Sequence, residues 1–418
     1  MKELYYKFYG ALERIRSLLI PDSYLELERC DALLCCSDAD RTDAYRGLAY
    51  SKFIDALAER LKSERVIVQQ FTWPYSQISK EKAWGAPKTG NRYFFLHSLL
   101  SKIFRLIGRR DYGDARALEF YAKLLALTGA RCLIGIGLPQ AAIKAAAVAG
   151  VKSIELLHGY GYSEVPWGWG LDRTVLPSRV FVFDEVSKDT FGRLGGRGVK
   201  VNLIPNYWYE RFSSDGGLAT SSADWATSYG WIPKSRKVIL VSLQWAYDGD
   251  HGEYRYFSGL LKNGLFPVEL LDVIKRSRES TYWIFRLHPV QLRGIRYRHH
   301  RRLLDRLVAD NKNCDWIRGS SAPLPSLLRH CHGHITMSSM TAYDAAFMGV
   351  RSLLLCPTLR PGGANASMFR DIREMGYAEL GACAPCGIGS WVETVQKAPQ
   401  LKIASSEAEA PLCKLIFE

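Results

Sequence analysis

The sequence predicts an α/β protein with two domains, each built on a parallel sheet. A chain of 418 residues is too long for one hydrophobic core and suits two domains of about two hundred residues. Short runs rich in Val, Ile and Leu alternate with helical patterns, which is typical of βαβ units. The clearest such unit is a strand, an Ala-rich helix and a strand at 131–137, 139–150 and 152–157. A linker-like run of Ser, Gly and Ala at 213–223 separates two sets of these patterns.

The apolar runs give the expected elements in chain order. After an amphipathic, basic helix at 6–20, we expect a helix at about 44–61 and a mostly helical, Arg-rich insertion at 72–128. The domains should be 1–210 and 236–400, joined by a linker at 211–235. The expected strands are 30–36, 66–71, 131–137, 152–157, 179–183 and 199–204 in the first domain, and 237–243, 284–288, 334–337 and 351–356 in the second.

The composition is that of an ordinary globular protein, with 47% hydrophobic and 23% charged residues. The net charge of +14 predicts an acidic partner, such as a nucleotide, an anionic polysaccharide, nucleic acid or an anionic membrane surface. The start lacks the apolar core of a signal peptide, and no apolar run reaches the roughly eighteen residues of a membrane span. We therefore expect a cytoplasmic protein, whose ten irregularly spaced cysteines are reduced thiols.

Two polar segments follow apolar strands in the second domain. The strand from Ile284 ends in Arg286, His288 and the strand-stopping Pro289. The strand at 334–337 leads to a hydroxyl-rich turn and then to a helical pattern at 342–349. Ligands bind open α/β sheets at the carboxyl ends of the strands, where both segments would meet.

The hydroxyl-rich turn carries Ser338, Ser339 and Thr341, and Asp344 lies in the helix that follows. A helix N-terminus with hydroxyl donors and nearby positive charge is a natural phosphate site. Taken singly, each segment is better explained as a helix cap or an ordinary loop. Taken together, the two segments favour phosphate binding.

These residues also resemble a known motif pair. A strand ending in His288-Pro289, followed fifty positions later by Ser338-Ser339 at a strand-to-helix turn, resembles bacterial capsule glycosyltransferases: polysialyltransferases, other sialyltransferases and 3-deoxy-manno-octulosonate (Kdo) transferases. The Arg-x-His-Pro pattern with an Asp in the next helix is similar to CDP-glycerol glycerophosphotransferases. The resemblance covers mainly residues 236–380.

The resemblance implies the GT-B architecture, in which two Rossmann-like domains face a central cleft. It also implies a cytidine-nucleotide donor, most simply a CMP-activated Kdo or sialic-type sugar, and chemistry without a metal or other cofactor. Arg286, His288, Pro289, Ser338, Ser339 and Thr341 would hold the nucleotide phosphate, and Asp344 would reach the ribose. Residues 401–418 would return to the N-terminal domain.

An inverting sugar transfer needs a base for the acceptor hydroxyl. Asp38 and Asp40 follow the first strand, where sialyltransferases carry an acidic motif, although capping explains them equally well. His158 ends another strand before a Gly-rich loop and resembles the His-Gly motif of the glycerophosphotransferases. It is a second candidate base, and a structural role fits it equally well.

Further contacts are expected in the loops beside these candidates. Gly159 permits close approach to a ligand, and Glu164 is a spare carboxylate in the same loop. Ser242 and Gln244 end the first strand of the second domain and should contact phosphate or sugar. His330, His332 and His334 alternate along a core strand and lack the paired spacing of zinc sites, so we expect no metal.

The predicted function is sugar transfer from a nucleotide donor to a glycan or lipid-linked glycan in capsule or lipopolysaccharide synthesis, in the cytoplasm or at the inner face of the membrane. Three alternatives remain. They are CDP-polyol phosphotransfer, 2-epimerisation of a nucleotide sugar, and non-catalytic binding of a glycan or nucleic acid through the basic surface, including 293–306. Of the acidic partners, nucleic acid is not expected.

Overall fold

The computed structural model describes residues 11–12, 14–108, 111–165, 176–210, 229–244, 257, 259–292, 297–401 and 411–418. The chain forms two compact units, unit 1 from Met1–Trp208 with Ile403–Glu418, and unit 2 from Tyr209–Lys402. Most of the expected linker lies outside the described residues. Its described end belongs to unit 2, where the Tyr229 ring stacks on His330 with the ring centroids 4.9 Å apart.

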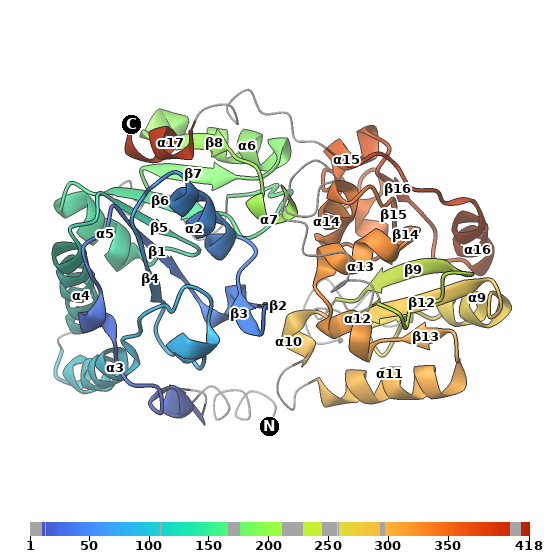
Figure 1. The fold of residues 1–418 in the computed structure, drawn as a ribbon, viewed down its shortest axis with the longest axis horizontal. Helices are drawn as coiled ribbons and strands as arrows, with labels where there is room; N and C mark the ends of the chain where they lie inside the picture. Colours follow the sequence, from blue (N-terminus) through green and yellow to red (C-terminus); the bar gives the residue numbers. More distant parts are fainter. Residues whose placement is uncertain are drawn as a thin grey trace. The chain divides into compact units, whose positions relative to one another are not determined.

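Unit 1 is a six-stranded parallel sheet with helices around it (Figure 1). The strand order is β4-β1-β5-β6-β7-β8, so the first strand of the chain lies inside the sheet, between the second and third of these six strands. All six strands expected in this domain are confirmed. They are β1 (Ala32–Cys36), β4 (Val68–Thr72), β5 (Cys132–Gly135), β6 (Lys152–Leu156), β7 (Arg179–Val182) and β8 (Lys200–Leu203).

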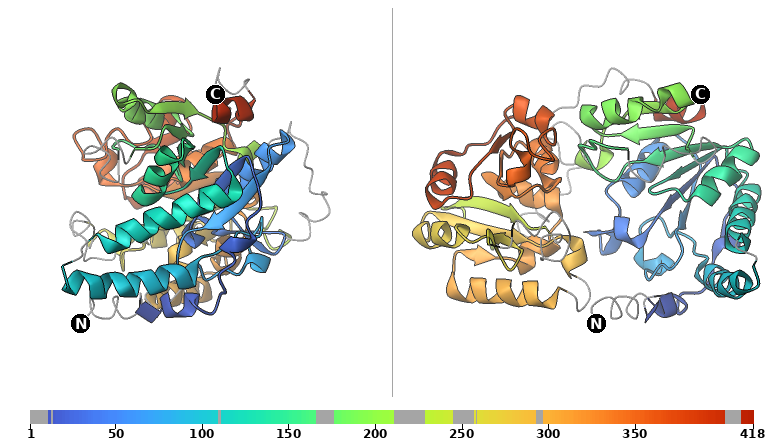
Figure 2. Two further views of the ribbon diagram at one scale, coloured as in Figure 1. Left: turned by 90° about the vertical axis from the view of Figure 1, so that its left-hand side faces the viewer. Right: turned by 180° about the vertical axis from the view of Figure 1, so that it is seen from behind.

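The helices of unit 1 follow the βαβ pattern, and their apolar faces cover the sheet. Phe120 and Leu124 pack with Leu33, Phe71 and Leu133 in one buried cluster. Figure 2 shows two long helices, α3 and α4, side by side on the outside of the unit. The helices are α2 (Ile54–Ser63), α3 (Asn91–Leu106), α4 (Tyr112–Thr128), α5 (Gln140–Val148), α6 (Glu185–Gly192), α7 (Tyr207–Glu210) and α17 (Leu412–Phe417), with short 3-10 turns at Tyr24–Glu26, Asp38–Asp40, Lys80–Lys82 and Gly195–Arg197.

The prediction of a helix at 44–61 is wrong for the first half of that range. The chain instead forms a hairpin, β2 (Asp43–Tyr45) and β3 (Leu48–Tyr50), before α2 begins. Arg46 and Gly47 both have positive φ, at 51° and 79°, which suits a two-residue hairpin turn. The Tyr50 ring packs on Trp84 and Trp208, so aromatic burial outweighs local helix propensity.

The chain returns to unit 1 at its C-terminal end. Helix α17 packs on α2, and the Glu64 side chain accepts a hydrogen bond from the Cys413 backbone N–H at 2.8 Å. Lys152 donates to the Phe417 carbonyl at 2.6 Å. These contacts anchor residues 411–418 beside the start of β6.

Unit 2 is also a six-stranded parallel sheet, with strand order β13-β12-β9-β14-β15-β16. This is the doubly wound order 3-2-1-4-5-6, whose switch point lies between the first and fourth strands, here β9 and β14. The four strands expected in this domain are confirmed. The strands are β9 (Lys237–Ser242), β12 (Thr281–Arg286), β13 (Cys314–Asp315), β14 (Gly333–Thr336), β15 (Ser352–Leu354) and β16 (Ala378–Leu380), with a small hairpin of β10 (Leu261–Lys262) and β11 (Phe266–Pro267).

The longest described helix of unit 2, α11, has 13 residues and is shorter than α3 and α4 of unit 1, which have 16 and 17. Helix α11 packs beside β13, and α14 packs against β14 and β15. The helices of unit 2 are α9 (Leu270–Arg276), α10 (Pro289–Leu292), α11 (Arg298–Asp310), α12 (Ile317–Ser321), α13 (Leu324–His330), α14 (Thr341–Phe347), α15 (Arg370–Glu374) and α16 (Pro385–Thr394), with a 3-10 turn at Pro357–Leu359.

Two further sequence predictions concern the whole chain. All ten cysteines are free thiols, as predicted, and seven of them are buried. Among the described residues, no helix is both long enough and apolar enough to cross a membrane.

Candidate functional site

The carboxyl ends of three neighbouring strands in unit 2 lie level with one another. Ser242 at the end of β9 is in register with Arg286 of β12 on one side and with Thr336 of β14 on the other. Two residues beyond each of these positions stand Gln244, His288 and Ser338. The sheet therefore brings three predicted site segments to one edge, beside the switch point where α/β sheets bind ligands.

Gln244 and Ser338 are joined directly across this switch point. The Gln244 side-chain carbonyl accepts the Ser338 backbone N–H at 2.9 Å, and its amide donates to the Ser338 hydroxyl at 3.2 Å. Thr336 adds a hydroxyl bond to the Ser242 carbonyl at 3.0 Å. The turn after β14 is thus fixed to the end of β9 before any ligand binds.

A fully buried glutamine fixes the His-Pro turn in the same way. The side-chain oxygen of Gln291 accepts the His288 backbone N–H at 2.8 Å, and its amide donates to the Gln244 carbonyl at 3.3 Å. The same amide faces Nδ1 of the buried His300 at 3.1 Å. Sequence reasoning missed Gln291, because a glutamine one turn after His-Pro has no pattern that marks it as buried.

Of the hydroxyl groups at the predicted phosphate site, those of Ser339 and Thr341 form hydrogen bonds within the turn, and that of Ser242 does not. Ser339 donates to the Thr341 hydroxyl at 3.0 Å and accepts the Thr341 backbone N–H at 3.3 Å, so these two residues cap the first turn of α14. The Ser242 hydroxyl is buried and has no hydrogen-bond partner within the described part of the chain. A buried hydroxyl without a partner is costly and marks a place where a ligand atom could bind.

Three other residues predicted to contact the nucleotide have roles in the local structure. Arg286 donates through Nη1 to the carbonyls of Gly319 and Ala322, both at 2.7 Å, and so holds the loop at the end of α12. Asp344 is 3% exposed, within the packed first turn of α14. Pro289 is the first residue of the one-turn helix α10 and fixes its start. Nucleotide contacts by these residues stay predictions.

The alternating histidines before the serine turn have separate partners. Nδ1 of His332 accepts the Val238 backbone N–H at 3.0 Å, and Nδ1 of His334 lies 2.8 Å from the Ser352 hydroxyl. Burial lowers the pKa of His334 to about 3, so this side chain is neutral. The part of the chain that the structure describes holds no group of three His, Cys, Asp or Glu side chains placed to bind a metal ion.

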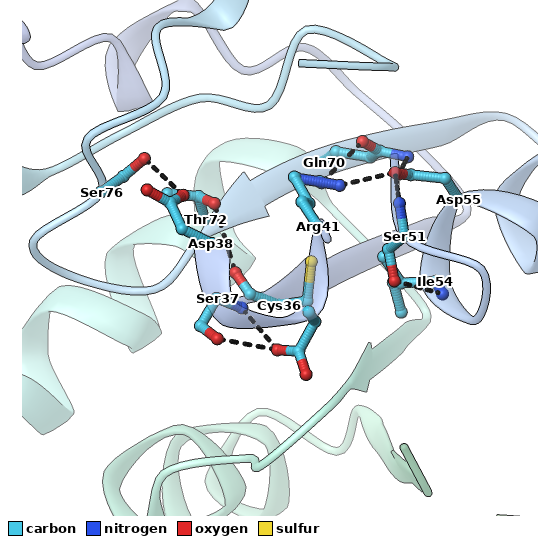
Figure 3. Close-up of polar contacts among 11 residues, drawn as sticks. Cys36, Ser37, Asp38, Arg41, Ser51, Ile54, Asp55, Gln70, Thr72 and Ser76 are labelled. Carbon is cyan, nitrogen blue, oxygen red and sulfur yellow. Dashed lines mark hydrogen bonds and ion pairs between the residues drawn. The ribbon is translucent and has the colours of Figure 1, made fainter. Parts of the chain in front are cut away.

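In unit 1, the two aspartates after β1 have different roles. Asp38 accepts a hydrogen bond from the Ser76 hydroxyl at 2.8 Å (Figure 3). It also accepts the backbone N–H groups of Gln77 and Ile78. Asp40 forms a capping box with Ser37. Asp38 therefore ties down the loop after β4, while Asp40 is held through one oxygen at the end of β1.

A buried polar network lies beside these aspartates. Arg41 donates to Asp55 at 2.7 Å and to the Gln70 side-chain oxygen at 3.2 Å, and Gln70 donates back to Asp55 at 3.0 Å (Figure 3). Arg41 is 1% exposed and Asp55 0%. An ion pair this deeply buried is rare. No local pattern predicts this network, because its three residues come from a loop, a helix and a strand.

His158 follows β6 in a loop that is fastened to the start of α6. Asp184 accepts the Gly161 backbone N–H at 3.0 Å, and the Ser187 hydroxyl accepts the Tyr162 N–H at 3.1 Å. The Tyr162 hydroxyl lies 3.3 Å from Nδ1 of His158. Desolvation lowers the pKa of His158, and the carboxylate of Asp40 acts in the opposite direction.

The other loop residues are less constrained. Gly159 lies beside the Tyr162 ring, which a Cβ at that position would contact at an ordinary 3.7 Å. Glu164 is exposed to solvent. The protein's own atoms therefore do not require a glycine at position 159. Contacts of Gly159 and Glu164 with a substrate stay predictions.

Glu155 is a buried carboxyl group that sequence reasoning missed. Its two oxygens accept the backbone N–H groups of Gly137 at 2.6 Å and Leu138 at 2.9 Å, at the turn that follows β5. Burial raises its pKa to about 8, against the effect of these two donors. It fixes the turn beside the switch point of the unit 1 sheet, which lies between β1 and β5.

The fold matches solved enzyme structures along most of the chain. No protein-family model matches the sequence, and no curated protein is similar to it in sequence. UDP-GlcNAc 2-epimerase from Methanocaldococcus jannaschii aligns over 92% of this chain and 98% of its own, with 12% identity and a TM-score of 0.55. The UDP-GlcNAc 2-epimerase from Neisseria meningitidis, bound to UDP-GlcNAc, aligns over 86% of this chain and 89% of its own, with 14% identity and a TM-score of 0.51.

A third similar structure is the wall teichoic acid polymerase TagF. It aligns over 92% of this chain and 84% of its own, with 11% identity and a TM-score of 0.53. The chain has the GT-B fold. Its two units are Rossmann-like, and the predicted fold class is confirmed. At these identities the likeness extends to the fold and no further.

Proposed function

We propose that this GT-B protein is a glycosyltransferase that moves a sugar from a nucleotide donor to a glycan or lipid-linked glycan acceptor. The donor class is a CMP-activated Kdo or sialic-type sugar, and the product belongs to capsule or lipopolysaccharide synthesis. The observation that carries the proposal is the shared register of Ser242, Arg286 and Thr336, which stand two residues before Gln244, His288 and Ser338 at the carboxyl ends of their strands. The choice of cytidine and of the sugar rests on the sequence resemblance alone.

In this proposal the switch point of unit 2 binds the donor phosphate. Ser338 and His288 stand on turns that Gln244 and Gln291 already hold in place. Ser242 contributes a buried hydroxyl between them. Fixed donors aimed at the leaving phosphate stabilise the charge that develops on it, because they need no reorganisation during the reaction. We infer that the transfer step needs no metal cation.

The acceptor proton would be taken in unit 1 by His158, with Asp40 nearby. Desolvation lowers the pKa of His158, so the imidazole is mostly neutral near pH 7 and can accept a proton. If Nδ1–H donates to the Tyr162 oxygen, Nε2 is the accepting nitrogen. The acceptor oxygen then bonds to the anomeric carbon, its proton moves to Nε2, and the nucleotide leaves with the electrons of the broken bond. We favour His158 over Asp38 as the base, because the oxygens of Asp38 accept hydrogen bonds from the loop after β4.

A CDP-polyol phosphotransferase is the second candidate. The Arg286-x-His288-Pro289 pattern and the strand-terminal His158 support it, because both resemble the glycerophosphotransferases. The same groups would then bind a diphosphate. Epimerisation of a nucleotide sugar is a third reaction that the fold accommodates, and it would proceed without an acceptor.

The test is a product assay with purified protein. CMP-sialic acid, CMP-Kdo, CDP-glycerol and UDP-GlcNAc are each supplied with and without a glycan acceptor, and products are identified by mass spectrometry. We expect CMP release that depends on the acceptor, reduced at least roughly a hundredfold by His288→Ala. His299→Ala, which removes an exposed imidazole from α11, is the matched control and should be fully active. No turnover of any donor, with glycan binding unaffected by His288→Ala, would establish a non-catalytic binding protein instead.

A further inference from the structure

Helix α3 of unit 1 exposes an unusually apolar outer face. Leu96, Leu99, Ile103, Leu106 and Ile107 are between 50% and 88% exposed. Their spacing of three and four residues places them on one side of the helix. Single exposed apolar residues are normal on a protein surface, but a continuous stripe of them marks an interaction site. We call this stripe the α3 face.

The opposite side of α3 already supplies the contacts that hold the helix on the unit. Tyr93 and Phe94 pack on Phe120 of α4, with ring centroids 4.6 and 4.7 Å apart. Phe104 stacks on Tyr112 at 4.2 Å. The helix is therefore apolar on both sides, and only the inner side is used by the described parts of the chain. Figure 2 shows α3 beside α4 at the outside of the unit.

The N-terminal segment beside the start of α3 also exposes apolar residues. Ile15 is 55% exposed and Leu19 is 82% exposed. This segment is attached to the start of α3, because Asn91 donates to the Ser17 carbonyl at 2.9 Å and Arg92 donates to the Leu18 carbonyl at 3.3 Å. Two segments with exposed apolar residues, separated in the sequence, are thus joined at the start of α3.

Cations accompany the apolar residues. Lys102 and Arg105 are exposed along one flank of α3, where they border a cavity of about 290 Å³ that Ser98 and Ser101 also line. Arg92, Arg14 and Arg16 are exposed at the other end of the surface. Of the nearby acidic groups, Asp22 is bound to the backbone N–H groups of Arg92 and Tyr93, while Asp111 and Asp114 lie beyond the turn after α3.

We propose that the α3 face docks on the surface of an anionic phospholipid bilayer, with α3 lying in the interface plane. An apolar helix face beside Lys and Arg is the pattern of interfacial helices, where the apolar side chains enter the headgroup boundary and the cations meet lipid phosphates. A second copy of this chain would bring the same cations together and repel them, whereas anionic headgroups neutralise them. The proposal does not depend on the transfer reaction.

Sedimentation of the full chain with lipid vesicles tests the proposal. One set of vesicles contains phosphatidylcholine alone, and the other contains equal parts of phosphatidylcholine and phosphatidylglycerol. We expect binding to the anionic vesicles only, weakening as salt is added. The double variant Leu99→Glu/Ile103→Glu should bind at least roughly tenfold more weakly, because it replaces two inserted apolar groups by anions. Lys102→Gln and Arg105→Gln should each weaken binding by roughly fivefold.

Val148→Glu is the matched control, because Val148 is an 86% exposed apolar residue at the end of α5. It should bind vesicles as the wild type does, and circular dichroism should show that all variants are folded. Equal binding of the wild type and the Leu99→Glu/Ile103→Glu variant would overturn the proposal. So would a dimer in light scattering that this double variant converts to a monomer, with no selective binding to anionic vesicles. Neither result bears on donor turnover, which is measured in solution.

Discussion

The side chain of Gln244 holds the backbone of Ser338 across the switch point of unit 2, with 2.9 Å between the Gln244 side-chain oxygen and the Ser338 nitrogen. The two residues are 94 positions apart and follow adjacent parallel strands. The side-chain amide of Gln291 donates a hydrogen bond to the backbone carbonyl of Gln244. The His-Pro turn and the serine turn are therefore coupled through one residue, and a ligand there would meet a preorganised site.

Replacing Gln244 by Glu separates structure from ligand binding. The carboxylate can still accept the Ser338 N–H, but it adds negative charge where we propose that a phosphate binds. We expect thermal stability close to that of the wild type and nucleotide affinity at least roughly tenfold weaker. Titration calorimetry measures the affinity. The control is Gln396→Glu, which makes the same change at an exposed residue. Nucleotide binding equal to the wild type would place the anion site elsewhere.

The pH dependence of turnover tests the assignment of His158. Its pKa is lowered by desolvation, so we expect activity to persist below the ordinary histidine range and to fall once the imidazole becomes protonated. Asp40 raises this pKa, so Asp40→Asn should move the acidic limb to lower pH. His158→Gln should abolish the limb together with most of the activity. A limb that stays in place in Asp40→Asn would assign the titration to another group.

Removing one partner of the buried Arg41–Asp55 pair should destabilise the protein more than removing both partners suggests. Asp55→Asn leaves the Arg41 charge buried without its counter-ion, which costs about 3–5 kcal/mol of unfolding free energy. Arg41→Met/Asp55→Leu removes both charges and should cost less than the two single changes added together. Urea unfolding measures each value. The control is Glu119→Gln, which breaks the exposed pair with Arg116 and should change stability by less than about 1 kcal/mol. Additive effects at Arg41 and Asp55 would contradict the pairing.

His334 predicts a loss of stability in acid. Its pKa is about 3 in the folded protein and near 6.5 when exposed, so the unfolded chain binds a proton that the folded chain rejects. The part of the unfolding free energy that depends on neutral His334 is fully present above pH 6.5 and is lost as the pH falls from 6.5 toward 3. The loss is at most about 5 kcal/mol, at about 1.4 kcal/mol per pKa unit. His334→Gln should flatten the stability profile in this window, whereas His299→Gln should leave it unchanged.

The sequence was informative where local pattern decides structure. The apolar runs before Ser242, His288 and Ser338 predicted strands, and a strand's end fixes where the next residues lie. The hairpin at 43–50 was missed because the packing of Tyr50 on distant tryptophans stabilises it more than local propensity stabilises a helix.

Buried polar partners could not be predicted in the same way. Gln291 and Glu155 bind backbone groups of distant turns, and these pairings exist only in the folded chain. The sequence also could not separate Asp38 from Asp40, since both follow the same strand. Their hydrogen bonds separate them, because Asp38 is held by three donors of the loop after β4.

Nucleotide binding tests the central claim most directly. The full chain and Gln244→Glu are titrated calorimetrically with CMP, CDP, UMP, UDP and GDP, first without a metal ion and then with magnesium. We predict selective binding of CMP by the wild type without magnesium, and its loss in Gln244→Glu. Preference for CDP would favour polyol-phosphate transfer at the same site. No binding of any nucleotide under either condition would contradict a nucleotide site at the switch point of unit 2.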